Sequence, residues 1–435
     1  MVSLVSRSSN PNLLVERALA LIPEAEEFLP FSDAVIASSH ADREKRWARS
    51  GAYATLGKRV VDVERLAASI PAIVARAQSR LQEMFALVLQ ALQEQQSGRP
   101  AAAAATLVAA GELEEGERRL ERAEAIYRMA LEMSRDLREK GPQILALRRL
   151  GRAARAAGRL DDAWEWYEQS WRLAADDLDE AGQAVACQGL GNVSDDRGDR
   201  ERAREWWERG LAIARRLDDA ALEWPFLSNL AILAMHGGDL ARAEELLARA
   251  RERMGPAGEG GAMLYWLNNR GLLQLEQGDP AAAEATFREA LALAGGAFWE
   301  MTMRVNLGEA LVPQGRLFEA AEEARRAEEI GIVNRLIADL VDVYLLLGSV
   351  AKARCDEEGF VFYEQALSVV HERGLPRKEE ARVLHGYGLL HAACGRPAEA
   401  RAYLEAARDV YQALGFAREL ARASDDLGSL ETAAV

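Results

Sequence analysis

Small residues recur along the chain with a period of forty. Glycine occupies the repeated position eight times and alanine once, and leucine precedes it in six of the nine cases. The spacing is forty at every step but one, which is thirty-seven. Such self-similarity is typical of stacked repeats. The nine anchor positions are Gly111, Gly151, Gly191, Ala231, Gly271, Gly308, Gly348, Gly388 and Gly428.

A second glycine follows most anchors after seven residues and predicts the end of a helix. An alanine and an aromatic residue come next, four apart, as in Ala203 with Trp207 and Ala283 with Phe287. Residues four apart share one helical face. We therefore expect two antiparallel helices per repeat, with small residues facing large ones. The second glycines are Gly158, Gly198, Gly238, Gly278, Gly315 and Gly395.

The composition favours helix throughout, because alanine, leucine, glutamate and arginine dominate and only 12 of 435 residues are proline. We predict an all-α protein. An α-solenoid of about eight helix-pair repeats would occupy residues 101–415, since one pair cannot bury its apolar face alone. Residues 416–435 would form a capping helix, and residues 1–100 a helical region that is either a cap or a set of degenerate repeats.

The pattern resembles the tetratricopeptide repeat in its forty-residue form. The resemblance covers roughly residues 101–435 and implies a right-handed superhelix whose concave wall is built from the first helices. Three second helices depart from the pattern, with Leu247, Ala324 and Leu404 in place of the aromatic residue, and the seventh repeat lacks its second glycine. The matching residues are Leu230, Ala231, Gly238, Ala243, Ala250, Gly271, Gly278, Ala283, Phe287 and Ala290.

The charge balance narrows the choice of partners. A formal net charge of −15 disfavours nucleic acid and anionic membrane surfaces. The three cysteines lack paired spacing, so we expect neither a disulfide framework nor a structural zinc site. The N-terminus lacks a signal-peptide core and no apolar run is long enough to span a membrane. We expect a cytoplasmic protein, from a GC-rich bacterium by its composition.

The first-helix positions after each anchor describe the expected concave wall. In the middle repeats these positions are apolar, and an apolar concave surface is a common binding site. Alternatively, these side chains pack against a neighbouring turn of the superhelix or against the N-terminal helices. The apolar wall residues are Ile232, Met235, Leu272, Leu275 and Val312.

Three asparagines, Asn229, Asn269 and Asn306, stand two residues before their anchors, and Asn192 follows its own anchor. An asparagine side chain can bond both the C=O and the N–H of an extended peptide. In kinesin light chains and Pins-type adaptors, which the array resembles, an asparagine at this place contacts a bound peptide backbone. The alternative use is a cap or an interhelical bond within the scaffold.

Arg148, Arg152 and Arg155 share one helical face and form a basic stripe that could grip an acidic motif. Because carboxylates occupy the adjoining repeats, ion pairs between neighbouring helices are the competing explanation. Six of the nine tryptophans lie between Trp164 and Trp224 and could serve core packing or an interface. Homo-oligomerisation is therefore left open.

No residue cluster indicates catalysis. His391 and Cys394 are three apart but lack further metal ligands nearby, and no glycine-rich phosphate loop is present. We expect no enzyme and no cofactor, but an adaptor or scaffold that holds an extended peptide of a partner protein. One alternative is a regulator that senses a peptide or a metabolite, because the array also resembles the ligand-receiving part of Rap-type regulators. The other alternative is a self-assembling structural protein.

Overall fold

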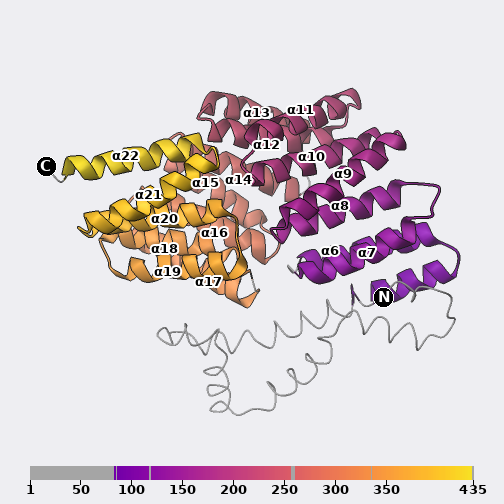
Figure 1. Ribbon diagram of the computed structural model, residues 1–435, viewed down its shortest axis with the longest axis horizontal. Helices are drawn as coiled ribbons and strands as arrows, with labels where there is room; N and C mark the ends of the chain where they lie inside the picture. The colour runs from indigo at the N-terminus through magenta and orange to yellow at the C-terminus, as the bar shows by residue number, and fades with distance from the viewer. Residues whose placement is uncertain (1–82, 85, 117–118, 256–259, 335, 434–435) are drawn as a thin grey trace, which may run out of the picture. The chain divides into compact units, whose positions relative to one another are not determined.

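The computed structural model describes residues 83–433 except 85, 117–118, 256–259 and 335. Its ordered elements are all α-helices in this described part (Figure 1). The chain divides into two compact units, residues 1–153 and 154–435, which we describe separately. Most of the N-terminal helical region predicted for residues 1–100 lies outside the described residues.

The first unit contains α6 (Pro100–Gly116), α7 (Leu120–Ser134) and most of α8 (Gly141–Ala156). Helices α6 and α7 form a packed pair, in which the ring of Tyr127 fills the space left by Gly111. A Cβ atom at Gly111 would lie 2.3 Å from Cε1 of Tyr127. The anchor of this first repeat must therefore be glycine.

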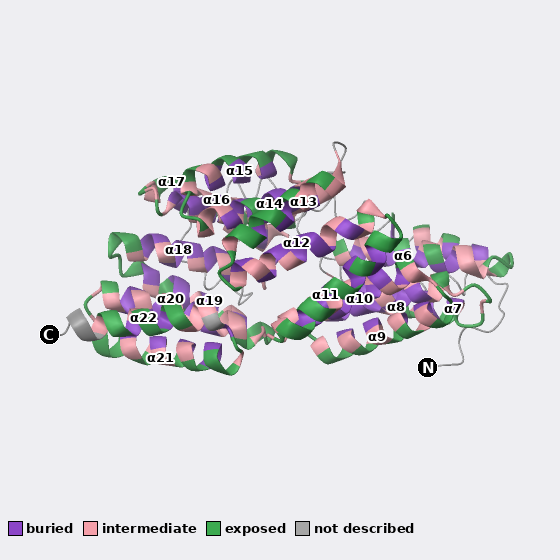
Figure 2. Cartoon of the chain, turned by 90° about the horizontal axis from the view of Figure 1, so that it is seen from above, coloured by how far each residue is buried: buried purple, intermediate pink, exposed green. Residues whose placement is uncertain are grey.

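The second unit continues with the same pairs, each first helix packing on its second helix and on the neighbouring pair. Buried residues follow the facing sides of these helices and exposed residues the outer sides (Figure 2). The helices are α9 (Leu160–Asp176), α10 (Glu180–Asp196), α11 (Arg200–Arg216), α12 (Ala220–His236), α13 (Leu240–Met254), α14 (Gly260–Glu276), α15 (Pro280–Leu293), α16 (Ala297–Leu311), α17 (Leu317–Val333), α18 (Leu340–Arg354), α19 (Glu358–Arg373), α20 (Arg377–Ala393), α21 (Pro397–Ala413) and α22 (Ala417–Ala433).

In six helix pairs the turn is built by the predicted second glycine. All six second glycines have φ between 70° and 81°, the left-handed region that favours glycine at the end of a helix. In three repeats the next residue is Asp199, Asp239 or Asp279, whose carboxylate accepts a hydrogen bond from the backbone N–H three residues later. This N-cap starts the second helix. The seventh repeat makes the same turn with Cys355, at φ 53°.

The small-against-large packing is confirmed at the anchors. A Cβ atom at Gly191 would lie 2.3 Å from the indole nitrogen of Trp207, and one at Gly271 would lie 2.4 Å from the ring of Phe287. Both rings are at least 98% buried. Where the aromatic residue is missing, an aliphatic side chain fills the space, as Leu346 of α18 does beside Gly308.

Three tryptophans of α9 and α11 form a half-buried cluster. The ring of Trp206 makes edge contacts with Trp164 and Trp171 at centroid distances of 6.1 and 6.0 Å. The guanidinium groups of Arg202 and Arg209 lie over two of these rings at 4.6 Å each. The cluster thus carries its own cation–π partners. Its use in self-assembly stays a prediction.

The last helix, α22, returns to repeats far upstream in the second unit. Arg418 pairs with Glu276 of α14 and donates to the carbonyl oxygen of Met235 at 3.2 Å, at the end of α12. The guanidinium of Arg200 lies 4.4 Å from the centre of the Phe416 ring, in the turn before α22. The predicted capping helix therefore also closes contacts across 142–183 residues of sequence.

Candidate binding site

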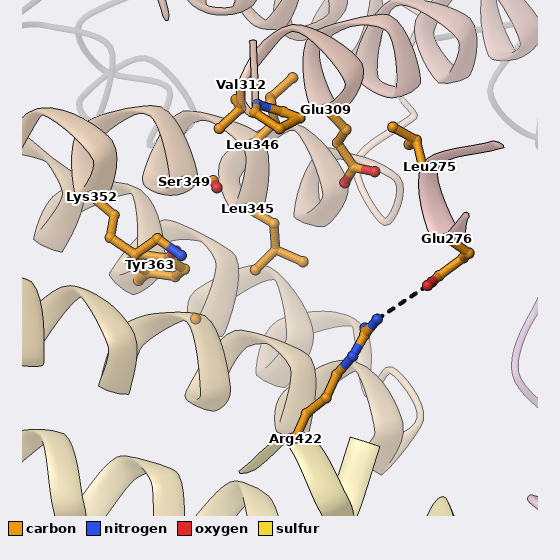
Figure 3. A pocket seen from close by; sticks show the side chains of 12 residues that line it. Leu275, Glu276, Glu309, Val312, Leu345, Leu346, Ser349, Lys352, Tyr363 and Arg422 are labelled. Atoms are coloured by element: carbon orange, nitrogen blue, oxygen red, sulfur yellow. Dashed lines mark hydrogen bonds and ion pairs between the residues drawn. The ribbon is translucent and has the colours of Figure 1, made fainter. Parts of the chain in front are cut away.

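A cavity of about 450 Å³ lies along the first helices α14, α16 and α18, with contributions from α19, α20 and α22 (Figure 3). We call it the inner cavity. It is built by the repeat register, because several of its residues stand one or four positions after an anchor glycine. Its lining residues are Leu275, Glu276, Glu309, Val312, Pro313, Leu345, Leu346, Ser349, Lys352, Tyr363, Gly386 and Arg422.

The aliphatic part of the wall comes from three successive first helices. Leu275 and Val312 each stand four residues after an anchor, and both are half-buried. Leu345 is also half-buried, whereas Leu346 is 1% exposed and belongs to the packed core. Half-buried aliphatic side chains at a cavity can bury further apolar surface when a ligand enters.

Tyr363 closes one side of the inner cavity. Its ring fits between two glycines, because a Cβ atom at Gly348 would lie 2.6 Å from the ring and one at Gly386 would lie 2.7 Å from it. The ring also stacks on Tyr387 at a centroid distance of 5.4 Å. This packing on several sides gives the cavity a rigid wall.

Two charged side chains enter the cavity from different sides. Figure 3 shows Glu309 and Lys352 with Ser349 and Leu345 between them. Within the described part of the chain, no hydrogen-bond or ion-pair partner reaches either charged group. Both groups are therefore available to a ligand.

The cavity environment disfavours the charged form of each group. Burial raises the pKa of the Glu309 carboxyl to about 7; Arg382 opposes this rise, and the carboxylates of Asp342 and Glu276 add to it. Burial also lowers the pKa of Lys352, against the opposing effect of Asp426. Perturbed ionisable groups in a cavity are typical of functional sites.

The rim of the cavity includes the returning helix. Arg422 of α22 donates to the Glu276 carboxylate at 3.1 Å, and this pair is visible at the edge of the cavity in Figure 3. A ligand in the inner cavity would lie beside α22 as well as beside the first helices.

The predicted asparagines are joined by hydrogen bonds between first helices. Asn229 is 6% exposed and donates to the side-chain oxygen of Asn192 at 3.0 Å. Asn306 donates to Asn268 at 2.8 Å, and Asn268 donates to Asn269, which is 1% exposed. These bonds match the alternative use of the asparagines, which is hydrogen bonding between helices within the scaffold. The peptide-binding role stays a prediction, and the half-buried Asn306 is better exposed for it than Asn229 or Asn269.

The predicted apolar wall residues differ in their exposure. Leu275 and Val312 line the inner cavity, and Ile232 and Leu272 are half-buried elsewhere on the first helices. Met235 is 4% exposed, and its carbonyl oxygen accepts the bond from α22 described above. Met235 therefore presents little side-chain surface to a ligand.

The basic stripe of α8 is engaged in ion pairs. Arg152 pairs with Glu115 at 2.5 Å in the first unit, and Arg155 pairs with Asp196 at 2.6 Å in the second. Arg148 also has an interaction partner. The arrangement agrees with pairing between neighbouring helices, and gripping an acidic motif stays a prediction.

His391 lies among aromatic rings. It is 6% exposed, and its ring centroid is 4.7–5.1 Å from those of Phe360, Tyr387 and Tyr403. Over the described residues, no group of three or more His, Cys, Asp or Glu side chains could hold a metal ion.

Residues 184–217 and 225–295 each match a family model of the tetratricopeptide repeat. These segments cover α10–α11 and α12–α15, whose turns and anchors are described above. The chain contains tetratricopeptide repeats in these two segments. Among the other described helix pairs, α18–α19 and α20–α21 have the same anchor packing and the same left-handed turn residue. A comparison with curated protein sequences gives no significant match.

Solved structures that are similar to this chain include a Rap protein complexed with competence and sporulation factor. It has a TM-score of 0.51 and 12% identity, over 76% of this chain and 98% of that one. The apo quorum sensor NprR from B. thuringiensis has a TM-score of 0.50 and 14% identity, over 77% and 99%. BtubC from P. vanneervenii has a TM-score of 0.42 and 23% identity, over 50% and 90%. At these low identities, the similarity to the Rap and NprR structures shows a shared fold.

Sequence reasoning on the repeats missed several residues of the site. Glu309 and Lys352 stand at wall positions, one and four residues after their anchors, and a charge within a mostly apolar wall was the available signal. Arg422 reaches the cavity only because α22 returns to α14, and no local pattern indicates that contact.

Among the described helices, none is long and apolar enough to cross a lipid bilayer.

Proposed function

We propose that this tetratricopeptide repeat protein is a non-catalytic adaptor whose inner cavity binds an extended peptide segment of a partner protein. The observation that carries the proposal is a cavity of about 450 Å³ with both apolar walls and unpaired charged groups. Its volume falls within the range of ligand pockets, about 300–1,000 Å³. Tetratricopeptide arrays with this architecture serve as interaction or sensor proteins, which fits such a use.

The walls supply affinity and the polar groups supply orientation. An aliphatic side chain that becomes fully buried against Leu275, Val312 and Leu345 gains roughly 1.5–3 kcal/mol from the hydrophobic effect. A bond to the peptide backbone from Asn306, which stands on α16 outside the cavity lining, would add about 0.5–1.5 kcal/mol and would set register more than affinity. Because association itself is costly, several such contacts are needed for a stable complex.

The lining residues give little support to a catalytic role. Neither histidine nor cysteine lines the inner cavity, so its hydroxyl groups on Ser349 and Tyr363 lack an imidazole base within the lining. We therefore propose binding without bond formation.

Site-specific photo-crosslinking in the native cell tests the proposal. A benzophenone amino acid replaces Ser349 in the cavity or, as the matched control, Phe318, which is 69% exposed on α17. We expect a peptide-linked partner at the cavity position and none at the control position. Leu275→Arg should abolish the crosslink, while Leu293→Arg, at an exposed position of α15, should preserve it. Equal crosslinking of both leucine variants would refute the proposed site.

A sensor is the second candidate function, and the position of α22 favours it. A ligand in the inner cavity would contact Arg422, so occupancy could change how firmly α22 holds Glu276. The NprR structure is that of a quorum sensor, the Rap structure is a complex with competence and sporulation factor, and both share this fold. For a sensor, a short peptide alone should raise the melting temperature of the protein and slow hydrogen exchange in α22. An adaptor requires no such change in α22.

A further inference from the structure

The inner cavity contains a carboxylate without a direct cationic partner. In the described part of the chain, no Lys, Arg or His nitrogen lies within ion-pair distance of Glu309. Figure 3 shows its carboxylate projecting between Val312 and Leu275, above Leu345. A buried charged group is stabilised by a direct, hydrogen-bonded counter-charge. The empty space beside Glu309 is where a ligand could supply one.

The nearby guanidinium groups are committed to other carboxylates. Arg382 of α20 donates to Asp342 of α18 at 2.8 Å and to Glu379 on its own helix at 2.6 Å. Arg422 of α22 donates to Glu276 of α14, as described above. Both arginines thus form their hydrogen bonds with carboxylates other than that of Glu309, and Arg382 acts on Glu309 only as a nearby charge. Asp342 and Glu276 also act on Glu309 as like charges.

The shape of the cavity selects the kind of cation. Leu275, Val312 and Leu345 form an aliphatic surface next to the Glu309 carboxylate. Lysine and arginine side chains carry a methylene stem that packs on apolar surface and a charged head that stays with polar groups. A small inorganic cation would leave this aliphatic surface uncovered.

We propose, building on the proposed peptide-binding function, that the inner cavity recognises a lysine or arginine side chain of the bound segment. Its stem lies along Leu275, Val312 and Leu345, and its cationic head pairs with Glu309. Lys352 lies on the other side of Ser349, and its ammonium group repels the cationic head of the ligand toward Glu309. It also offers a donor to a backbone carbonyl of the same segment.

Recognition of a cation by Glu309 makes binding depend on pH. At a carboxyl pKa of about 7, Glu309 is about one-tenth ionised at pH 6 and about nine-tenths ionised at pH 8. If only the ionised form binds, apparent affinity scales with the ionised fraction. We expect an affinity about ten-fold higher at pH 8 than at pH 6.

The test uses arginine blocked at both ends as the probe, and blocked citrulline as its neutral isostere. Binding to the full chain is measured by calorimetry at pH 6 and pH 8 for three proteins: the unchanged chain, Glu309→Gln, and Glu289→Gln at an exposed position of α15 as the control. We expect arginine to bind the unchanged and control proteins at least ten-fold more tightly than Glu309→Gln. Citrulline should show no such preference.

Three results would overturn the proposal. One is equal binding of arginine and citrulline, another is unchanged arginine affinity in a folded Glu309→Gln protein, and the third is a stronger response to blocked aspartate, which would assign the cavity to an anion on Lys352. The photo-crosslinking experiment separates this failure from failure of the proposed function. Partner crosslinks at Ser349 that survive Glu309→Gln would retain peptide binding and remove the cation specificity.

Discussion

Replacing an anchor glycine by alanine tests the packing rule on which the whole array depends. In Gly271→Ala the new Cβ would lie 2.4 Å from Cε1 of Phe287, whose ring is fully buried. Carbon atoms in good contact are about 3.5 Å apart, so the overlap is roughly 1 Å. Because the ring has no open space to enter, helices α14 and α15 must move apart.

The expected magnitude follows from two opposing effects. Overpacking a core of this kind costs about 1–3 kcal/mol, and full burial of the ring places Gly271→Ala near the upper end. Alanine in a helix interior gains about 1 kcal/mol over glycine. We expect a net loss of about 2 kcal/mol in the free energy of unfolding.

A matched control lies on the same helix. A Cβ atom at Gly261 meets nothing within 4 Å, so Gly261→Ala should keep only the gain in helix propensity. The double variant Gly271→Ala/Phe287→Leu should recover much of the loss. It reproduces a pair already present in the chain, since the one alanine anchor, Ala231, belongs to the repeat that has Leu247 in place of the ring.

Equilibrium urea unfolding, followed by far-UV circular dichroism, measures these differences. Midpoints are compared only where the slope is unchanged, because repeat arrays can unfold in more than one step. Equal stability of Gly271→Ala and Gly261→Ala would contradict the packing rule.

Further measurements address the charged and polar groups. Burial lowers the pKa of His391, so below pH 6.5 the unfolded chain takes up the proton more readily than the folded protein does. The folded protein should therefore lose stability as pH falls below 6.5. His391→Phe should remove this loss, as measured by urea titrations at pH 5 and 7. Glu309 has a raised pKa, so its protonated form favours folding at low pH, and this contribution is lost as pH rises from 4.5 to about 7; Glu309→Gln should flatten that part of the stability profile. Asn192→Ala should cost about 1–3 kcal/mol, because the buried Asn229 amide loses its acceptor, and calorimetric melting would show no change if that bond were unimportant. Glu276→Gln should weaken the partly exposed ion pairs that hold α22 by at most about 1 kcal/mol. Hydrogen exchange of α22 should then accelerate a few-fold, and high salt should have the same effect on the unchanged protein. Equal exchange rates in the variant and the unchanged protein would argue against a role of these pairs in holding α22.

The helix pairs could be predicted from the sequence because their determinants are local. Gly271 and Phe287 are sixteen residues apart, and the turn glycine Gly278 lies between them. Side-chain size and backbone conformation at these positions act within one repeat. The seventh repeat departs from this pattern. There Cys355 takes the left-handed conformation that the turn needs, which the sequence pattern did not predict.

The candidate site was less predictable, because it depends on how repeats are staggered and where the array meets itself. The asparagine bonds join Asn192 with Asn229 and Asn268 with Asn306, so the partners occupy different positions of their repeats. The alignment of repeats alone pointed to Asn269 instead of Asn268. The pair between Arg418 and Glu276 spans 142 residues and has no local signature.

The return of α22 makes repeat number a fixed property of this chain. In an open array, duplication or deletion of one helix pair changes length and leaves the remaining interfaces intact. Here an added pair between α14 and α22 would carry Arg418 and Arg422 away from Glu276. Evolution by whole-repeat gain or loss, the simplest route open to such genes, would therefore have to rebuild the closing contact at every step.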